Sequence, residues 1–180
     1  MIVLLGMVGA GKTAQASRLG RRHGWHWLST GEVLRQSEDP VVRSYLDRGK
    51  LLPDEQMQEL IVRELKKLPS EKQVIFDGFP RRISQAEWLE SLLVKTGQSV
   101  GCAIHLTIDP ATAQQRLKLR ARHDDSQSGI ETRMREYEDS VVPVVAFYKK
   151  SGLLDEINAV GTEDEVARRI SNALRRRRLI

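Results

Sequence analysis

The residues best suited to chemistry stand near the start of the sequence, in GMVGAGKT from Gly6 to Thr13. This stretch matches the pattern G-x-x-x-x-G-K-[ST] and lies between an apolar run and a helical segment, as that pattern requires. Its glycines let successive backbone N–H groups turn toward an anion, and Lys12 can bridge the outer phosphates of a nucleotide. The complete set favours ATP or GTP binding over a merely tight strand-to-helix turn. The loop leaves the reaction open.

Short apolar runs alternate with longer amphipathic segments, which predicts a parallel β-sheet covered by helices. From Thr132 to Tyr148, apolar residues keep helical spacing, which predicts a helix there. Two segments, residues 31–65 and 120–129, have the character of insertions, and loops at the carboxyl ends of parallel strands are where such folds bind ligands. The strands are expected at residues 1–6, 25–29, 73–78, 102–108 and 155–160.

The composition indicates a soluble cytoplasmic protein with one domain. The chain has 180 residues, of which 40% are apolar, enough for one substantial core. It contains no apolar run long enough to span a membrane and no secretion-signal pattern. The single cysteine, Cys102, excludes an internal disulfide and a cysteine-based zinc site. Without the run Arg175–Arg178 the net charge of +5 falls to +1, so a solvated basic helix end is favoured over a nucleic-acid surface.

Several short motifs occur in the order seen in adenylate kinases. The most specific is DGFPR, followed by Gln85 four residues after Arg81, in combination with the glycine-rich loop. The chain resembles the adenylate kinase family of nucleoside monophosphate kinases over nearly its full length. The motifs that carry the resemblance are LSTGEVLR (28–35), RGKLLPDE (48–55), FDGFPRRISQA (76–86) and RHDD (122–125).

The resemblance implies an α/β P-loop fold with a five-stranded parallel sheet of order 2-3-1-4-5. Residues 1–180 would form a single kinase domain, with an acceptor-binding segment at 29–58 and a truncated lid at 120–129. The implied reaction is the reversible conversion of ATP and AMP to two ADP with Mg²⁺, by a monomer that binds no nucleic acid and no zinc.

The chemistry of this reaction explains why arginines are numerous. The phosphate of a nucleoside monophosphate is already a dianion at pH 7, so no general base is needed to make the nucleophile. The protein must instead offset repulsion between two polyanions and stabilise charge on the moving phosphoryl group. By resemblance, Arg35 and Arg81 would grip the acceptor phosphate, while Arg122 and Arg133 would reach across the donor and acceptor phosphates.

The resemblance also assigns the donor side. Arg116 would lie over the donor base, Arg120 near its phosphates, and Asp77 would hold Mg²⁺ through water with help from Thr13. The expected catalytic residues are Lys12, Arg81, Arg120, Arg122 and Arg133. The expected ATP-binding residues are Gly9, Ala10, Gly11, Lys12, Thr13, Ala14, Arg116, Arg120 and Gly161. The expected AMP-binding residues are Thr30, Arg35, Lys50, Leu51, Leu52, Gly78, Phe79, Pro80, Arg81, Gln85, Arg122 and Arg133.

The acceptor base is assigned from two residues. The amide of Gln85 can meet a base edge with one donor and one acceptor. Thr30 stands where adenylate kinases similarly have threonine, whereas pyrimidine-specific relatives tend to have alanine. These residues favour AMP, with CMP or UMP as the alternative acceptors.

The sequence departs from the family pattern in three places. It reads Lys12-Thr13-Ala14 where adenylate kinases usually read G-K-G-T, and we hypothesise that the Thr13 hydroxyl replaces part of the lost magnesium contact. The segment between Arg35 and Lys50 is shorter than expected. Only Ala121 separates Arg120 from Arg122, so the lid is almost absent and some ATP hydrolysis without acceptor is expected.

A hypothesis from a different functional class is that the chain is a nucleotide-binding regulator. Such a protein would have lost catalytic turnover and would use its arginine tail to contact RNA or another acidic partner. The intact set of Lys12, Arg35, Arg81, Arg122 and Arg133 argues against lost chemistry.

Overall fold

Five parallel strands form one sheet in the order β2-β3-β1-β4-β5, which confirms the predicted order. The computed structural model describes residues 1–69, 71–120 and 126–180, apart from the side chain of Arg120. Four strands lie within the ranges expected from the sequence, and β5 begins one residue before its expected range and ends two residues before the end of that range. The strands are β1 (Ile2–Leu5), β2 (His26–Ser29), β3 (Val74–Asp77), β4 (Cys102–Thr107) and β5 (Leu154–Asn158).

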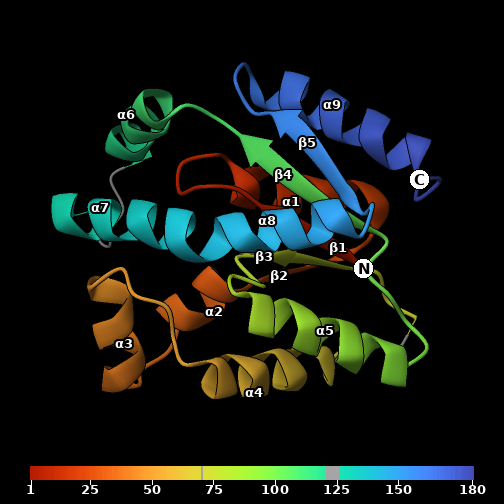
Figure 1. The fold of residues 1–180 in the computed structure, drawn as a ribbon, viewed down its shortest axis with the longest axis horizontal. Coiled ribbons are helices and arrows are strands. Elements are labelled where there is room, and N and C mark those ends of the chain that lie inside the picture. The colour runs from red at the N-terminus through yellow and green to blue at the C-terminus, as the bar shows by residue number, and fades with distance from the viewer. Residues whose placement is uncertain (70, 121–125) are drawn as a thin grey trace.

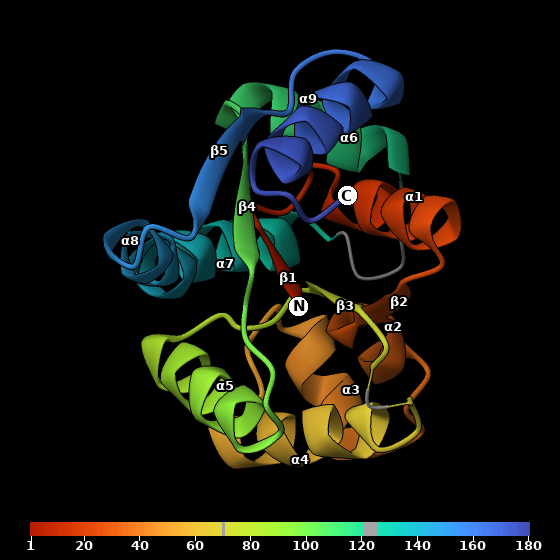
Figure 2. The same ribbon diagram turned by 90° about the vertical axis from the view of Figure 1, so that its right-hand side faces the viewer.

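Helices cover both faces of this sheet (Figures 1 and 2). They are α1 (Lys12–His23), α2 (Thr30–Arg35), α3 (Pro40–Asp47), α4 (Asp54–Leu65), α5 (Ile83–Lys95), α6 (Pro110–Arg120), α7 (Gln127–Glu136), α8 (Val142–Lys150) and α9 (Glu163–Arg176), with a π-helical segment, η1 (Tyr137–Val141), between α7 and α8. No helix in the described ranges is both long and apolar enough to cross a bilayer.

The alternation of side chains along β1 divides the core in two. Val3 and Leu5 point into a cluster with the apolar sides of α4, α5 and α8, whereas Ile2 and Leu4 point into a second cluster with α1 and α9. All four side chains are at most 2% exposed. Because both faces are covered at the centre of the sheet, β1 is continuously apolar, as buried parallel strands are, whereas the edge strands β2 and β5 are only partly buried.

The helix expected from Thr132 to Tyr148 is divided by η1. Pro143 stands in the first turn of α8 and has no N–H to donate to the carbonyl one turn earlier. The wider π-helical turn of η1 precedes it, and such turns accommodate an interrupted hydrogen-bond ladder. The prediction was therefore right about helical character and wrong about a single regular helix.

The arginine run at the C-terminus is partly tied to the sheet. Arg177 donates hydrogen bonds to the carbonyls of Gly152 and Leu154, at 3.1 Å each, and pairs with the carboxylate of Asp155. The side chain of Arg177 is 23% exposed, against 66% for Arg176. The predicted solvated helix end therefore describes Arg176 and not Arg177, which anchors the end of α9 beside β5.

The register of the central strands gathers their carboxyl ends. Leu4 of β1 pairs with Asp77 at the end of β3, and Leu5 pairs with His105 of β4. The glycine-rich loop after β1 and the segment after β3 therefore leave the sheet side by side.

Candidate active site

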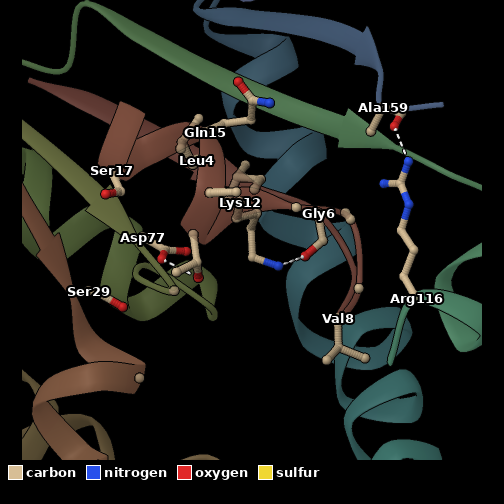
Figure 3. Close-up of a pocket in the computed structure, with 18 of the residues that line it drawn as sticks. Leu4, Gly6, Val8, Lys12, Gln15, Ser17, Ser29, Asp77, Arg116 and Ala159 are labelled. Atoms are coloured by element: carbon tan, nitrogen blue, oxygen red, sulfur yellow. Dashed lines mark hydrogen bonds between the residues drawn. The ribbon is translucent and has the colours of Figure 1, made fainter. Parts of the chain in front are cut away.

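A cleft of about 760 Å³ opens at the carboxyl ends of the strands. The glycine-rich loop, Asp77 and Arg116 line it from different elements, and Figure 3 shows Lys12, Asp77 and Arg116 around this space. A smaller pocket of about 70 Å³ adjoins the cleft beneath α2 and the start of α4. The cleft and the pocket share the side chains of Arg35, Arg81 and Arg133. The two spaces therefore meet at a cluster of positive charge.

The glycine-rich loop is folded for an anion. Gly9 has a φ of +86° and lies so close to α6 that a Cβ there would stand 2.7 Å from the carbonyl oxygen of Ala113. Only glycine fits this position without strain. The Nζ of Lys12 donates to the carbonyl oxygens of Gly6 (2.6 Å) and Met7 (2.9 Å), so the lysine lies across the loop at the N-terminus of α1 (Figure 3). N–H groups, helix terminus and ammonium together attract phosphate.

The side chains of Thr13 and Asp77 bring two oxygen-bearing groups together beside the loop. The Thr13 hydroxyl donates to Oδ2 of Asp77 at 2.8 Å, and the indole N–H of Trp27 approaches the same oxygen at 3.4 Å. Asp77 is 3% exposed. Carboxylate and hydroxyl oxygens are the donors Mg²⁺ prefers, and this ion is usually held by one or two such groups plus substrate phosphates. The pair fits that pattern; among the described residues, no cluster of three or more histidine, cysteine or acidic side chains is placed to hold a metal.

Three arginines meet between the cleft and the pocket. Burial lowers the pKa of the Arg81 guanidinium, the carboxylate of Asp77 raises it, and the like charges of Arg133 and Arg35 lower it. The Nε of Arg81 donates to the carbonyl of Gly78 at 2.8 Å, which fixes the direction of its planar head. Arg35 is exposed and Arg81 and Arg133 are half-buried, and all three border the space that the cleft and the pocket share. A bound anion would offset the repulsion among these like charges. The arrangement is therefore suited to a phosphate group.

The smaller pocket is lined by both polar and apolar residues. Gln85, which is 2% exposed, accepts a hydrogen bond from the backbone N–H of Arg81 and donates one to Oδ1 of Asp54, each at 2.8 Å. Thr30 donates to the backbone carbonyl of Asp77 at 3.3 Å. The remaining lining includes Leu52 and other apolar residues of α2 and α4. Such a lining suits a flat ring with one hydrogen-bonding edge.

On the opposite side of the cleft, Arg116 of α6 lies against the loop after β5. Its Nη2 donates to the carbonyls of Ala159 (3.0 Å) and Gly161 (3.3 Å), a contact visible for Ala159 in Figure 3. Gly161 and Val166 line the cleft there. The planar guanidinium is thus held beside a partly apolar surface, where a base could stack.

Most residues expected from the sequence are brought together. The expected ATP-binding residues that line the cleft are Gly9, Ala10, Gly11, Lys12, Thr13, Ala14, Arg116 and Gly161. The expected AMP-binding residues that line the cleft or the pocket are Thr30, Arg35, Lys50, Leu51, Leu52, Gly78, Pro80, Arg81, Gln85 and Arg133.

Three expected residues need separate mention. The side chain of Phe79 lies in the hydrophobic core, 1% exposed, with its ring 6.1 Å from those of both Phe76 and Trp88. Arg122 lies outside the described residues, and so does the side chain of Arg120.

Two functional candidates were missed in the sequence. Trp27 points to Asp77, and Asp54 holds Gln85. A signal for Trp27 was its position two residues before the end of the strand that pairs with β3. No pattern in the sequence links Asp54 to Gln85, since they are 31 residues apart and meet only through the fold.

Comparison with known proteins identifies the family of this chain. The sequence profile of the family described as "Adenylate kinase" matches residues 4–153. The adenylate kinase of Thermus thermophilus is 38% identical, over 96% of this chain and 96% of the relative. The adenylate kinases of Maricaulis maris and Thermobifida fusca are 36% and 34% identical, over at least 96% of each chain. The match to the profile and to full-length relatives shows that the chain belongs to the adenylate kinase family.

Proposed function

We propose that the cleft binds ATP, that the smaller pocket binds the base of AMP, and that the reversible family reaction, ATP + AMP ⇌ 2 ADP, proceeds where they meet. The observation that carries this proposal is the sharing of Arg35, Arg81 and Arg133 by a phosphate-loop cleft and a separate, smaller pocket. A simple nucleotide hydrolase would need only the first.

The chain's contribution is charge and position. The acceptor phosphate is a dianion at neutral pH, so it can attack without losing a proton to a side chain. Arg35 and Arg81 would bind its oxygens, with Arg81 already oriented by the Gly78 carbonyl. Lys12 would bridge the outer phosphates of the donor, and Arg133 would stabilise negative charge on the transferred phosphoryl group. Arg120 and Arg122 are proposed for the same task from the resemblance.

Magnesium fits the pair Thr13 and Asp77. The ion, when bound, would neutralise charge on the donor phosphates. The two residues would hold it from the protein side, Asp77 directly or through water, and Trp27 would restrain the Asp77 carboxylate.

The acceptor base is proposed to meet Gln85. This residue lines the pocket together with Thr30 and residues 50–52. Residues 29–58 would form the acceptor-binding segment and residues 120–129 a truncated lid on the single domain. We also propose that the enzyme is a monomer and that it is cytoplasmic.

The test is an acceptor panel. Magnesium and ATP are incubated with AMP, CMP, UMP, GMP or dTMP, and with no acceptor, while diphosphate products are separated by chromatography. AMP is expected to give the fastest ADP formation, and the short lid a slow, detectable hydrolysis without acceptor. Preference for CMP or UMP would overturn the base assignment. ADP formed at the no-acceptor rate throughout would instead indicate a hydrolase or a nucleotide-binding regulator.

A further inference from the structure

The orientation of the Gln85 amide is fixed by two partners of opposite kind. The backbone N–H of Arg81 can only donate, and it does so to Oε1 of Gln85 at 2.8 Å. The carboxylate of Asp54 can only accept when ionised, and Nε2 of Gln85 donates to its Oδ1 at 2.8 Å. Turning the amide over would set a donor against a donor and an acceptor against an acceptor. One orientation is therefore selected.

The surroundings of Asp54 keep it ionised, so that it accepts this hydrogen bond. It begins α4, where a helix N-terminus favours negative charge, and α4 lies alongside α5 in both overall views (Figures 1 and 2). From the start of α5 and the residue before it, Ser84 and Arg82 also donate to its carboxylate, Arg82 at 2.7 Å. Burial raises the pKa of Asp54, but the hydrogen bonds from Ser84, Arg82 and Gln85 outweigh it and hold the pKa below its ordinary value. At neutral pH the group is a carboxylate.

The fixed amide favours one class of base edge. A primary amide has a second lone pair on its oxygen and a second hydrogen on its nitrogen, so each atom can serve the protein and a ligand together. Adenine and cytosine present an amino group beside an unprotonated ring nitrogen. Hypoxanthine, guanine and uracil present a carbonyl beside a ring N–H, the reverse pattern. A freely turning glutamine would accept both patterns.

We propose that Asp54 is a specificity-positioning residue, which, with the Arg81 N–H, holds Gln85 so that the pocket selects acceptor bases carrying an amino group and rejects those carrying a carbonyl at the same place. This rests on the proposed function of Gln85 as the residue that meets the base. Asp54 itself touches no substrate in this scheme; it acts through Gln85.

The test compares AMP with inosine monophosphate (IMP), which differs from AMP only by this reversed edge. In Asp54→Asn the side chain can accept or donate, so that only the Arg81 N–H still opposes the turned amide, and the ratio of kcat/KM for AMP to that for IMP should fall about tenfold. Ser84→Ala is the matched control, because it removes a contact to Asp54 without touching Gln85, and its ratio should stay within about twofold of the wild type. Thermal melting of both variants reports any loss of folding separately from the ratio.

Two variants test the role of Gln85 and the role of Asp54 separately. Gln85→Met should abolish most of the discrimination; if it does not, the assignment of Gln85 to the base is wrong. If Gln85→Met abolishes it but a folded Asp54→Asn keeps the wild-type ratio, only the role of Asp54 is overturned. The wild-type enzyme gives a check that needs no variant: CMP must be a better acceptor than UMP, and the reverse order contradicts a fixed amide.

Discussion

Removing the hydroxyl of Thr13 should weaken the binding of the magnesium ion that the enzyme needs, by a measurable amount. Thr13 donates to the 3% exposed carboxylate of Asp77 at 2.8 Å, in a region the family normally supplies with a hydroxyl one residue later. In Thr13→Ala, Asp77 loses its nearest donor and the metal site loses an oxygen ligand. The change leaves the loop glycines and Lys12 in place.

The magnitude follows from the type of contact. A hydrogen bond to a charged group contributes about 1.5–3 kcal/mol, and about 1.4 kcal/mol corresponds to a tenfold change in affinity. Water can enter the space left by the hydroxyl, so the lower end applies. The free Mg²⁺ concentration that gives half-maximal ADP formation should therefore rise about tenfold.

The assay follows initial ADP formation at saturating ATP and AMP while free Mg²⁺ is varied. Thr13→Ser keeps the hydroxyl and is the control, with a half-maximal concentration close to that of the wild type. If Thr13→Ala and Thr13→Ser need the same free Mg²⁺ concentration, the Thr13 hydroxyl has no part in the metal site. The hypothesis that it replaces the hydroxyl missing at Ala14 would then be wrong.

Three further substitutions test separate parts of the account. Arg81→Lys loses planar two-point binding of phosphate and should lower kcat/KM for AMP by about tenfold to a hundredfold, whereas Arg63→Lys, at an exposed side chain, should leave it unchanged in the same steady-state assay. Arg177→Ala should lower the free energy of unfolding by about 2 kcal/mol in urea titrations, since it breaks a half-buried ion pair, against less than about 0.5 kcal/mol for the exposed Arg176. Burial lowers the pKa of His105 below 6.5, so that under this pH the unfolded chain binds a proton that the folded chain does not. The free energy of unfolding therefore falls as the pH drops through 6.5. His105→Gln should remove this pH-dependent part of the stability in urea titrations between about pH 7.5 and 5.5.

The sheet and the phosphate loop could be predicted because their determinants are local. Buried parallel strands must be continuously apolar, and the loop must carry glycine where a Cβ would strike a neighbour, as at Gly9 against Ala113. The order of the strands, in contrast, came from resemblance to the family. Local patterns give elements, while their arrangement depends on contacts between distant residues.

The rest of the site depends on such distant contacts. Apolar spacing alone gave one helix through Pro143, because it carries no information on a missing N–H. Phe79 has the motif position of a site residue, yet its ring fills the core. The link between Asp54 and Gln85 exists only because α4 and α5 lie side by side. The sequence therefore predicts which residues belong to the site, but not which distant side chains they contact.

The central claim is that two nucleotides meet in this cleft and a phosphoryl group passes directly between them. The most direct measurement is a single turnover of ATP labelled in its terminal phosphate, with excess enzyme, Mg²⁺ and AMP, sampled on the millisecond scale. The account predicts that most of the label appears in the ADP formed from AMP, with only a minor fraction as inorganic phosphate and none bound to protein. Label that appears first on the protein, or mainly as inorganic phosphate regardless of AMP, would contradict it.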